Sequence, residues 1–115
     1  MDIKEVHITI NVGDMDKAIS FYTAIGFEVK KRWENYYAKL QLSGMVLGLH
    51  PTAKIHLRDG SGNLSIGLMV QEMTEAKQLL KEKSIPFNER NEEGGHFLHF
   101  TDPDGNALYY INPKW

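Results

Sequence analysis

Residues 7–27 read HITINVGDMDKAISFYTAIGF, a strand pattern followed directly by a helix pattern. Apolar and polar residues alternate up to Val12, which is the two-residue period of a strand with one buried face. Apolar residues then recur at intervals of three and four, and Asp14 or Asp16 can cap the helix. Gly26 follows the last turn, where glycine commonly ends a helix. This stretch predicts a β-α unit.

The same pattern returns in the second half of the chain. Val12 corresponds to Val70 and Met15 to Met73, at the same separation in both cases. Three further alternating segments follow each helix, so each half reads β-α-β-β-β. Two copies are too few for a repeat array, and they indicate a duplicated domain.

This organisation predicts an α+β fold of two tandem βαβββ modules that form a cupped mixed sheet, with the helices on its outer face. The predicted single domain covers residues 1–115. Module one is residues 1–52, module two is residues 64–115, and residues 53–63 form a polar, glycine-bearing linker.

Composition excludes several classes of protein. The 115 residues contain 13 Lys and Arg, 15 Asp and Glu, and no cysteine, which gives a net charge of −2. That balance offers no basic surface for nucleic acid or membranes, and no disulfide can form. No apolar run approaches the roughly 18 residues needed to span a bilayer. We expect a cytoplasmic protein with neither nucleic acid nor membrane as a partner.

Strand parity predicts which side chains face away from the helices. In the first strand the alternate apolar residues Val6, Ile8, Ile10 and Val12 should pack under the helix. His7 and Thr9 therefore point to the opposite face. Pairing across the turn Ser43–Gly44 places Lys39 opposite Gly48 on that same face. In module one the face receives His7, Thr9, Tyr37, Lys39, Gly48 and His50.

The last hairpin needs one extra residue in its turn. A strict four-residue loop would mix the two faces, whereas one bulged residue at the glycine pairs Phe100 with Leu108 and Leu98 with Tyr110. Module two then contributes Ser65, Met69, His99 and Tyr109 to the face turned from the helices. Such a face is either an ordinary half-wet sheet or the lining of a ligand cavity.

The tandem β-α-β-β-β halves, the histidine of the first strand and the DPDGN turn resemble the vicinal oxygen chelate superfamily. That superfamily contains glyoxalase I, bleomycin-resistance proteins, fosfomycin-resistance enzymes and extradiol dioxygenases. The resemblance spans about Ile3 to Pro113, and its most specific pieces are residues 7–27 and FTDPDGNALYYINP at 100–113.

In metal-dependent members each module supplies one ligand from its first strand and one from its last. The resemblance places these positions at His7, Gly48, Ser65 and Tyr109. Only His7 is a good ligand, since glycine has no donor and tyrosine is protonated at neutral pH. We therefore prefer no metal cofactor, although a divalent metal is an alternative.

A displaced metal site would use three histidines. His7, His50 and His99 share the predicted face and could hold one ion if each imidazole came within about 2.1 Å of it. The competing interpretation is that these histidines form hydrogen bonds with a ligand or water.

The preferred function is metal-independent binding of a small molecule, similar to bleomycin-resistance proteins. Trp33, Tyr37 and Tyr109 offer flat surfaces for an aromatic ligand. The alternative is a divergent metal-dependent lyase or dioxygenase that acts on vicinal oxygens, and a third is a subunit whose cavity is filled by side chains. Whether the chain is an enzyme stays open.

Charge predicts the sign of the ligand. Lys30, Arg32 and Lys39 share one strand parity, which indicates either a solvated basic rim or attraction of an anion. The absence of a side chain at Gly48 should leave room beside His7 for a ligand group. We also expect a homodimer, because the edge strands of so small a sheet need covering.

Overall fold

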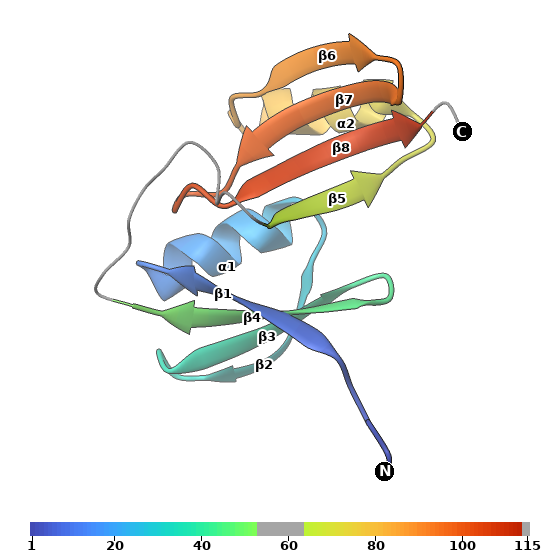
Figure 1. Cartoon of the computed structure of the whole chain (residues 1–115). Coiled ribbons are helices and arrows are strands. Elements are labelled where there is room, and N and C mark those ends of the chain that lie inside the picture. Colours follow the sequence, from blue (N-terminus) through green and yellow to red (C-terminus); the bar gives the residue numbers. More distant parts are fainter. Residues whose placement is uncertain (53–63, 114–115) are drawn as a thin grey trace. The chain divides into compact units, whose positions relative to one another are not determined.

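The structure is a computed structural model that describes residues 1–52 and 64–113. The chain divides into two compact units, Met1–Leu57 and Arg58–Trp115. Each unit has a four-stranded mixed sheet and one helix (Figure 1), which confirms the predicted α+β fold of two βαβββ modules. The predicted linker 53–63 lies outside the described residues.

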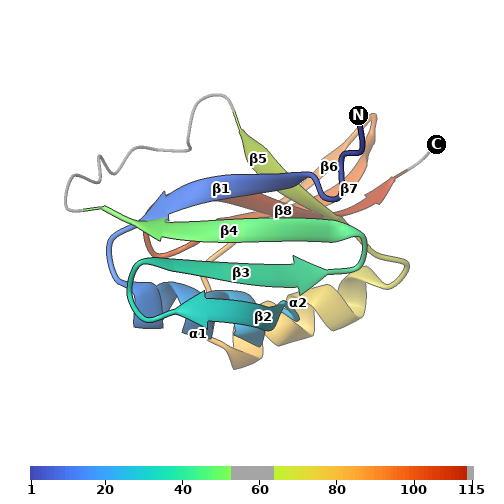
Figure 2. The same cartoon turned by 90° about the horizontal axis from the view of Figure 1, so that it is seen from below.

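In the first unit the strand order is β1–β4–β3–β2 (Figure 2). Strand β1 pairs parallel with β4, and the other pairs are antiparallel. A parallel pair requires a crossover connection, and α1 provides it on one face of the sheet. The elements are β1 (His7–Val12), α1 (Met15–Ala24), β2 (Glu28–Trp33), β3 (Tyr37–Leu42) and β4 (Met45–Pro51).

The core of this unit lies between α1 and the sheet. Tyr22 of α1 is fully buried, as are Leu40 and Leu47, which face each other across β3 and β4. The Asp14 side chain accepts a hydrogen bond from the Lys17 backbone nitrogen at 3.0 Å and caps the helix. The apolar phase of the strands therefore packs under the helix, as predicted.

The second unit repeats this arrangement in the order β5–β8–β7–β6. Strand β5 pairs parallel with β8, and α2 forms the crossover. The elements are β5 (Ser65–Met69), α2 (Met73–Glu82), β6 (Asn88–Glu92), β7 (Gly95–Thr101) and β8 (Ala107–Pro113). Within the described ranges, neither helix is long and apolar enough to cross a membrane.

The hairpin between β7 and β8 has the predicted register. Phe100 pairs with Leu108 and Leu98 with Tyr110, so the extra residue of the turn keeps apolar side chains together. Gly105 of this turn has a φ of 85°, which a residue without Cβ adopts readily.

A buried carboxylate holds that turn together. Asp102 is only 4% exposed. One of its oxygens accepts from the backbone nitrogens of Asp104 and Asn106, both at 2.9 Å, and the other accepts from the Asn106 amide at 2.8 Å. Charge-assisted hydrogen bonds of this kind offset the burial of a carboxylate.

Strand β2 contains a β-bulge between Val29 and Lys31. Beyond it, Lys31 pairs with Lys39 and Arg32 with Ala38. Ala38 belongs to the buried phase of β3, so Arg32 lies on the side of the sheet that carries α1. Because a bulge inserts one residue, every later side chain of the strand lies on the opposite face from the one that strict alternation predicts.

The prediction that Lys30, Arg32 and Lys39 share one face was therefore wrong. The Arg32 guanidinium lies 2.9 Å from the Asp16 carboxylate of α1. It links sheet to helix, while Lys39 points the other way. The basic residue that accompanies Lys39 is Lys31, whereas strict alternation from Glu28 would put Lys31 on the helix side of the sheet.

Candidate functional site

One row of residues crosses the face of the first sheet that is turned away from α1. The register pairs Thr9 with Gly48, Gly48 with Lys39, and Lys39 with Lys31. His7 lies two residues before Thr9 on β1 and has the same parity. The face thus places a histidine, a threonine and two lysines along neighbouring strands.

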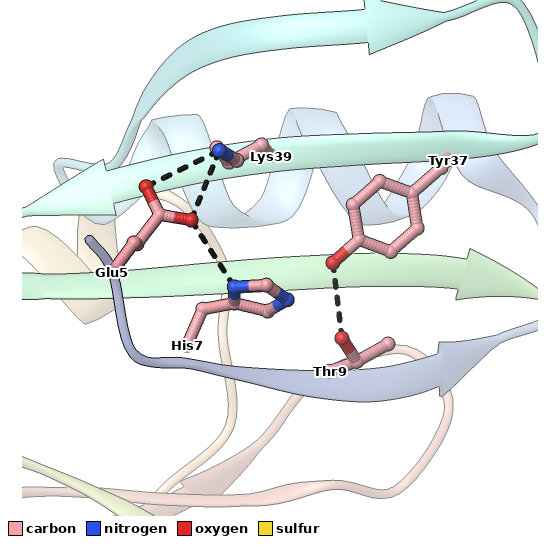
Figure 3. Close-up of polar contacts among 5 residues, drawn as sticks. All are labelled: Glu5, His7, Thr9, Tyr37 and Lys39. Atoms are coloured by element: carbon pink, nitrogen blue, oxygen red, sulfur yellow. Dashed lines mark hydrogen bonds and ion pairs between the residues drawn. The ribbon is translucent and has the colours of Figure 1, made fainter. Parts of the chain in front are cut away.

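Glu5 connects His7 of β1 with Lys39 of β3 (Figure 3). Its carboxylate lies 2.9 Å from the Lys39 ammonium and 3.1 Å from His7 Nδ1. The hydrogen bond donated by Lys39 is the main reason that the pKa of the Glu5 carboxyl lies below its ordinary value, and His7 acts in the same direction. Lys39 is therefore paired with a carboxylate of the chain.

The tyrosine of β3 lies over the glycine of β4. The Tyr37 hydroxyl and Thr9 Oγ1 are 3.0 Å apart and form a hydrogen bond between β3 and β1 (Figure 3). A Cβ at Gly48 would lie 2.6 Å from Tyr37 Cζ and 2.7 Å from Thr9 Oγ1. The space over Gly48 holds these two side chains, so the expected room for a ligand group beside His7 is not there.

An aromatic pair borders the lysines. The rings of Trp33 and Tyr37 pack with centroids 5.8 Å apart, and Trp33 is 42% exposed. The Lys31 ammonium lies 4.9 Å from the centre of the Trp33 ring, a cation–π contact. In residues 1–52 and 64–113, Lys31 forms no ion pair.

His50 lies at the other end of this sheet from His7. Its partner on β1 is Asn11, whereas the partner of His7 is Val46. Four residues along a strand span roughly 13 Å, whereas imidazole nitrogens on one ion each lie about 2.1 Å from it. Among the residues that the structure describes, no three His, Asp or Glu side chains gather as a metal site would require.

In the second unit, Tyr109 and His99 pair directly across β8 and β7 and lie on the face turned from α2. The Tyr109 ring covers Gly67 of β5, where a Cβ would lie 2.6 Å from its hydroxyl. His99 stacks on Phe97 with centroids 5.5 Å apart and planes only 7° from parallel. His99 thus belongs to an aromatic cluster.

The remaining predicted residues of this unit lie at its edge strand. Ser65 and Met69 of β5 are exposed opposite Ala107 and Ile111 of β8. They share the face of Tyr109, in agreement with strand parity. One continuous face is predicted for nine of these residues, and it stays a prediction: His7, Thr9, Lys39, Gly48, His50, Ser65, Met69, His99 and Tyr109. Ligand binding by these nine and by Trp33 and Tyr37 also stays a prediction. A cavity of about 360 Å³ in this unit is lined by Pro86, Phe87, Asn88, His99, Phe100, Thr101, Ala107 and Leu108.

The four positions that the resemblance assigns to a metal do not fit one. His7 offers an imidazole, but Gly48 has no donor and lies beneath the Tyr37 ring. Ser65 supplies a hydroxyl, and Tyr109 supplies a phenol whose ring lies over Gly67. A divalent ion needs three or more imidazole, thiolate or carboxylate ligands, and this set contains one.

Comparison with known proteins now identifies the family. The family model described as Glyoxalase/Bleomycin resistance protein/Dioxygenase superfamily matches residues 5–110. This chain belongs to that superfamily. The match confirms the resemblance to vicinal oxygen chelate proteins, and it includes Glu5 at its first position.

Solved structures of this superfamily have the same fold. One is a single-site mutant of the fosfomycin resistance protein FosX from Listeria monocytogenes, complexed with Mn(II) and 1S,2S-dihydroxypropylphosphonic acid. It is 19% identical, with a TM-score of 0.79, and the match covers 99% of this chain and 95% of that one. Another is a bleomycin-binding protein complexed with bleomycin, at 20% identity, with a TM-score of 0.73 and coverage of 97% and 100%. At these identities the likeness shows the fold alone.

Sequence reasoning missed Glu5, Lys31 and Phe97. Glu5 precedes His7 by two residues, so the period of the strand, continued backwards, would have placed it on the same face. Phe97 has the parity of His99 and was available from the same argument. Lys31 had no such signal, because the bulge that turns it is not visible in the local pattern.

Proposed function

We propose that this chain binds a small organic anion with a planar part, on the face of the first unit formed by β1, β4, β3 and β2, without a complete metal site. The observation that carries the proposal is the pairing of Lys39 with Lys31 beside the rings of Trp33 and Tyr37. The geometry supports a binding function, and it assigns no residue to a chemical step.

The charges on this face favour an anion. Like charges directly opposite each other destabilise a sheet. Glu5 neutralises Lys39, while Lys31 has only the face of Trp33 as a partner in the described part of the chain. The row of lysines therefore carries more positive charge than Glu5 compensates, and a bound carboxylate, phosphate or phosphonate would remove that excess.

The aromatic pair favours a planar group next to the charge. Trp33 is partly exposed and Tyr37 is held in place by its hydrogen bond to Thr9. Large, rigid rings contribute much contact area to ligand binding while losing little conformational freedom. An anion whose charged group reaches the lysines would place an attached ring near Trp33.

The solved relatives support binding of a small molecule. The FosX structure contains a phosphonic acid, and the bleomycin-binding protein contains bleomycin. The first ligand has the anionic chemistry proposed here. Both proteins share with this chain the fold that positions the face.

The proposal is tested with phenylphosphonate, which combines an anion with a ring. Titration followed by NMR of the backbone amides should show saturable shifts at Thr9, Gly48 and Lys39. Lys39→Met should weaken binding by about 1–3 kcal/mol, the loss of one charge-assisted hydrogen bond. Lys17→Met, on α1 at the other side of the sheet, is the matched control. Equal affinity in Lys39→Met and Lys17→Met would contradict the proposal.

A metal-dependent enzyme is the second candidate, and one observation favours it. His7 directs Nδ1 to the Glu5 carboxylate at 3.1 Å, the arrangement that commonly orients a metal-binding imidazole. Stoichiometric Zn, Mn, Ni or Fe in protein purified without chelator, lost in His7→Ala, would overturn the metal-independent proposal in favour of this candidate.

The proposal includes assembly as a homodimer. Strands β1 and β2 form the edges of the first sheet and β5 and β6 those of the second. Edge strands present unpaired backbone groups that proteins usually cover. Light scattering at micromolar concentration should give twice the 13.2 kDa mass of one chain. A particle of single-chain mass would rule out the dimer.

A further inference from the structure

The Glu5 carboxylate forms an ion pair with Lys39, the residue that is proposed to hold the ligand. We infer that this carboxylate occupies the anion position formed by Lys39 and His7 in the free protein, and that an anionic ligand binds by displacing it. This inference rests on the function proposed above. It makes Glu5 an internal competitor that sets the affinity of the site.

Both oxygens of Glu5 are engaged (Figure 3). Oε2 lies 2.9 Å from Lys39 Nζ and 3.1 Å from His7 Nδ1, and Oε1 accepts from Lys39 at 3.2 Å. Lys39 stands on β3 and His7 on β1, with β4 between them. One carboxylate therefore bridges two strands that are not neighbours, as the carboxylate or phosphonate of a ligand could do.

The segment that carries Glu5 lies outside the sheet. The ladder of β1 begins at His7, opposite Val46, and residues 1–6 have no regular secondary structure. All six are exposed. Because Glu5 is not held by the pairing of strands, its carboxylate can leave Lys39 without disturbing the register of the sheet.

The contacts of Glu5 are open to solvent. The side chains of Glu5, His7 and Lys39 are 36%, 39% and 29% exposed. Each ion pair at this exposure is weak, so a ligand can displace Glu5, and the contacts with Lys39 and His7 together lower the affinity for a ligand by no more than about tenfold. A ligand anion would re-form the contacts with Lys39 and His7 that Glu5 gives up.

The neighbouring lysine gives a reason for an internal carboxylate. Lys39 and Lys31 are paired across β3 and β2, and Glu5 supplies negative charge beside them. Without Glu5 or a ligand, neither lysine of this pair would have an ionic partner among the described residues. Glu5 thus stabilises the empty face, and the same contact lowers its apparent affinity for ligands.

The experiment compares wild type with Glu5→Gln, which keeps the size and removes the charge. The apparent dissociation constant is inversely proportional to the fraction of time the site is vacant, so a Glu5 that fills it about nine-tenths of the time weakens binding about tenfold. We expect Glu5→Gln to bind phenylphosphonate about tenfold more tightly. Glu28→Gln removes a charge from the same sheet without touching Lys39 and should change affinity less than twofold.

The outcomes separate this inference from the proposed function. Tighter binding in Glu5→Gln that is lost again in Glu5→Gln/Lys39→Met supports both. Suppose that wild type binds, that Lys39→Met abolishes binding, and that Glu5→Gln binds equally or more weakly than wild type. This result retains the proposed function and overturns the inference. If neither wild type nor Glu5→Gln binds phenylphosphonate, both are overturned. Equal tightening in Glu28→Gln would attribute the effect to overall charge and also overturn the inference.

Discussion

Replacing Gly48 by alanine should destabilise the first unit through Tyr37. The added Cβ would lie 2.6 Å from Tyr37 Cζ and 2.7 Å from Thr9 Oγ1, closer than real Cβ atoms approach other atoms. The flexible partner is the tyrosine side chain, so the ring must turn away from β4. It then loses its hydrogen bond to Thr9 and its packing on Trp33.

The size of the effect follows from these two contacts. The hydrogen bond contributes about 0.5–1.5 kcal/mol, and the aromatic pair about 0.5–1.5 kcal/mol. Alanine also reduces the conformational entropy of the unfolded chain, and this offsets about 0.4–1 kcal/mol of the lost stability. Gly48→Ala should therefore lower the free energy of unfolding by about 1–2 kcal/mol.

Urea unfolding followed by tryptophan fluorescence measures this change. Gly44→Ala is the matched control, because the Cβ at that turn glycine would meet nothing within 4 Å. It should be neutral or slightly stabilising. In a Tyr37→Ala background, Gly48→Ala should lose most of its effect, since the obstructing ring is gone. An equal loss of stability in both backgrounds, or none in wild type, would refute the assignment to Tyr37.

Two further predictions concern the second unit. Asp102→Ala should lower the free energy of unfolding by about 2–3 kcal/mol, because the Asn106 backbone nitrogen and amide lose a charged acceptor; a urea midpoint equal to that of wild type would contradict this. The hydrogen bond from Lys77 is the largest cause that lowers the pKa of Glu89 below its ordinary 4.5, and His96 adds to it. A lowered pKa in the folded state stabilises the protein above pH 4.5, and this contribution disappears as the pH falls through the lowered value. Urea midpoints between pH 6 and 3 should therefore fall less steeply in Lys77→Met than in wild type, and parallel profiles would disprove the link.

Local patterns in the sequence were sufficient for the two βαβββ modules and for two hairpin registers. Across Ser43–Gly44 and across the DPDGN turn, the pairing partners are close in the chain, and a slip by one residue would expose an apolar face. Alternation therefore fixed Lys39 opposite Gly48, and Phe100 opposite Leu108, as the structure has them. The same parity placed His7, Thr9 and Tyr109 on faces turned from the helices.

The bulge in β2 was decided only by the folded sheet. Nothing in the sequence from Glu28 to Trp33 marks the place where the strand takes up an extra residue. The folded sheet does so between Val29 and Lys31, and Arg32 then reaches Asp16 of α1. The bulge breaks the local alternation, and Arg32 forms its long-range contact with the helix beyond it. Strand parity therefore predicted the wrong face for the residues that follow the bulge.

The site also depends on pairings between segments far apart in the chain. The parallel register of β1 and β4 separates His7 from His50, and no turn between the two strands transmits that register through local sequence. The meeting of Glu5 with Lys39 depends on that register and on the order β1–β4–β3. The sequence by itself thus determined which side chains share a face. The tertiary structure decided which of them touch, because contact across non-adjacent strands depends on the register of every strand between them.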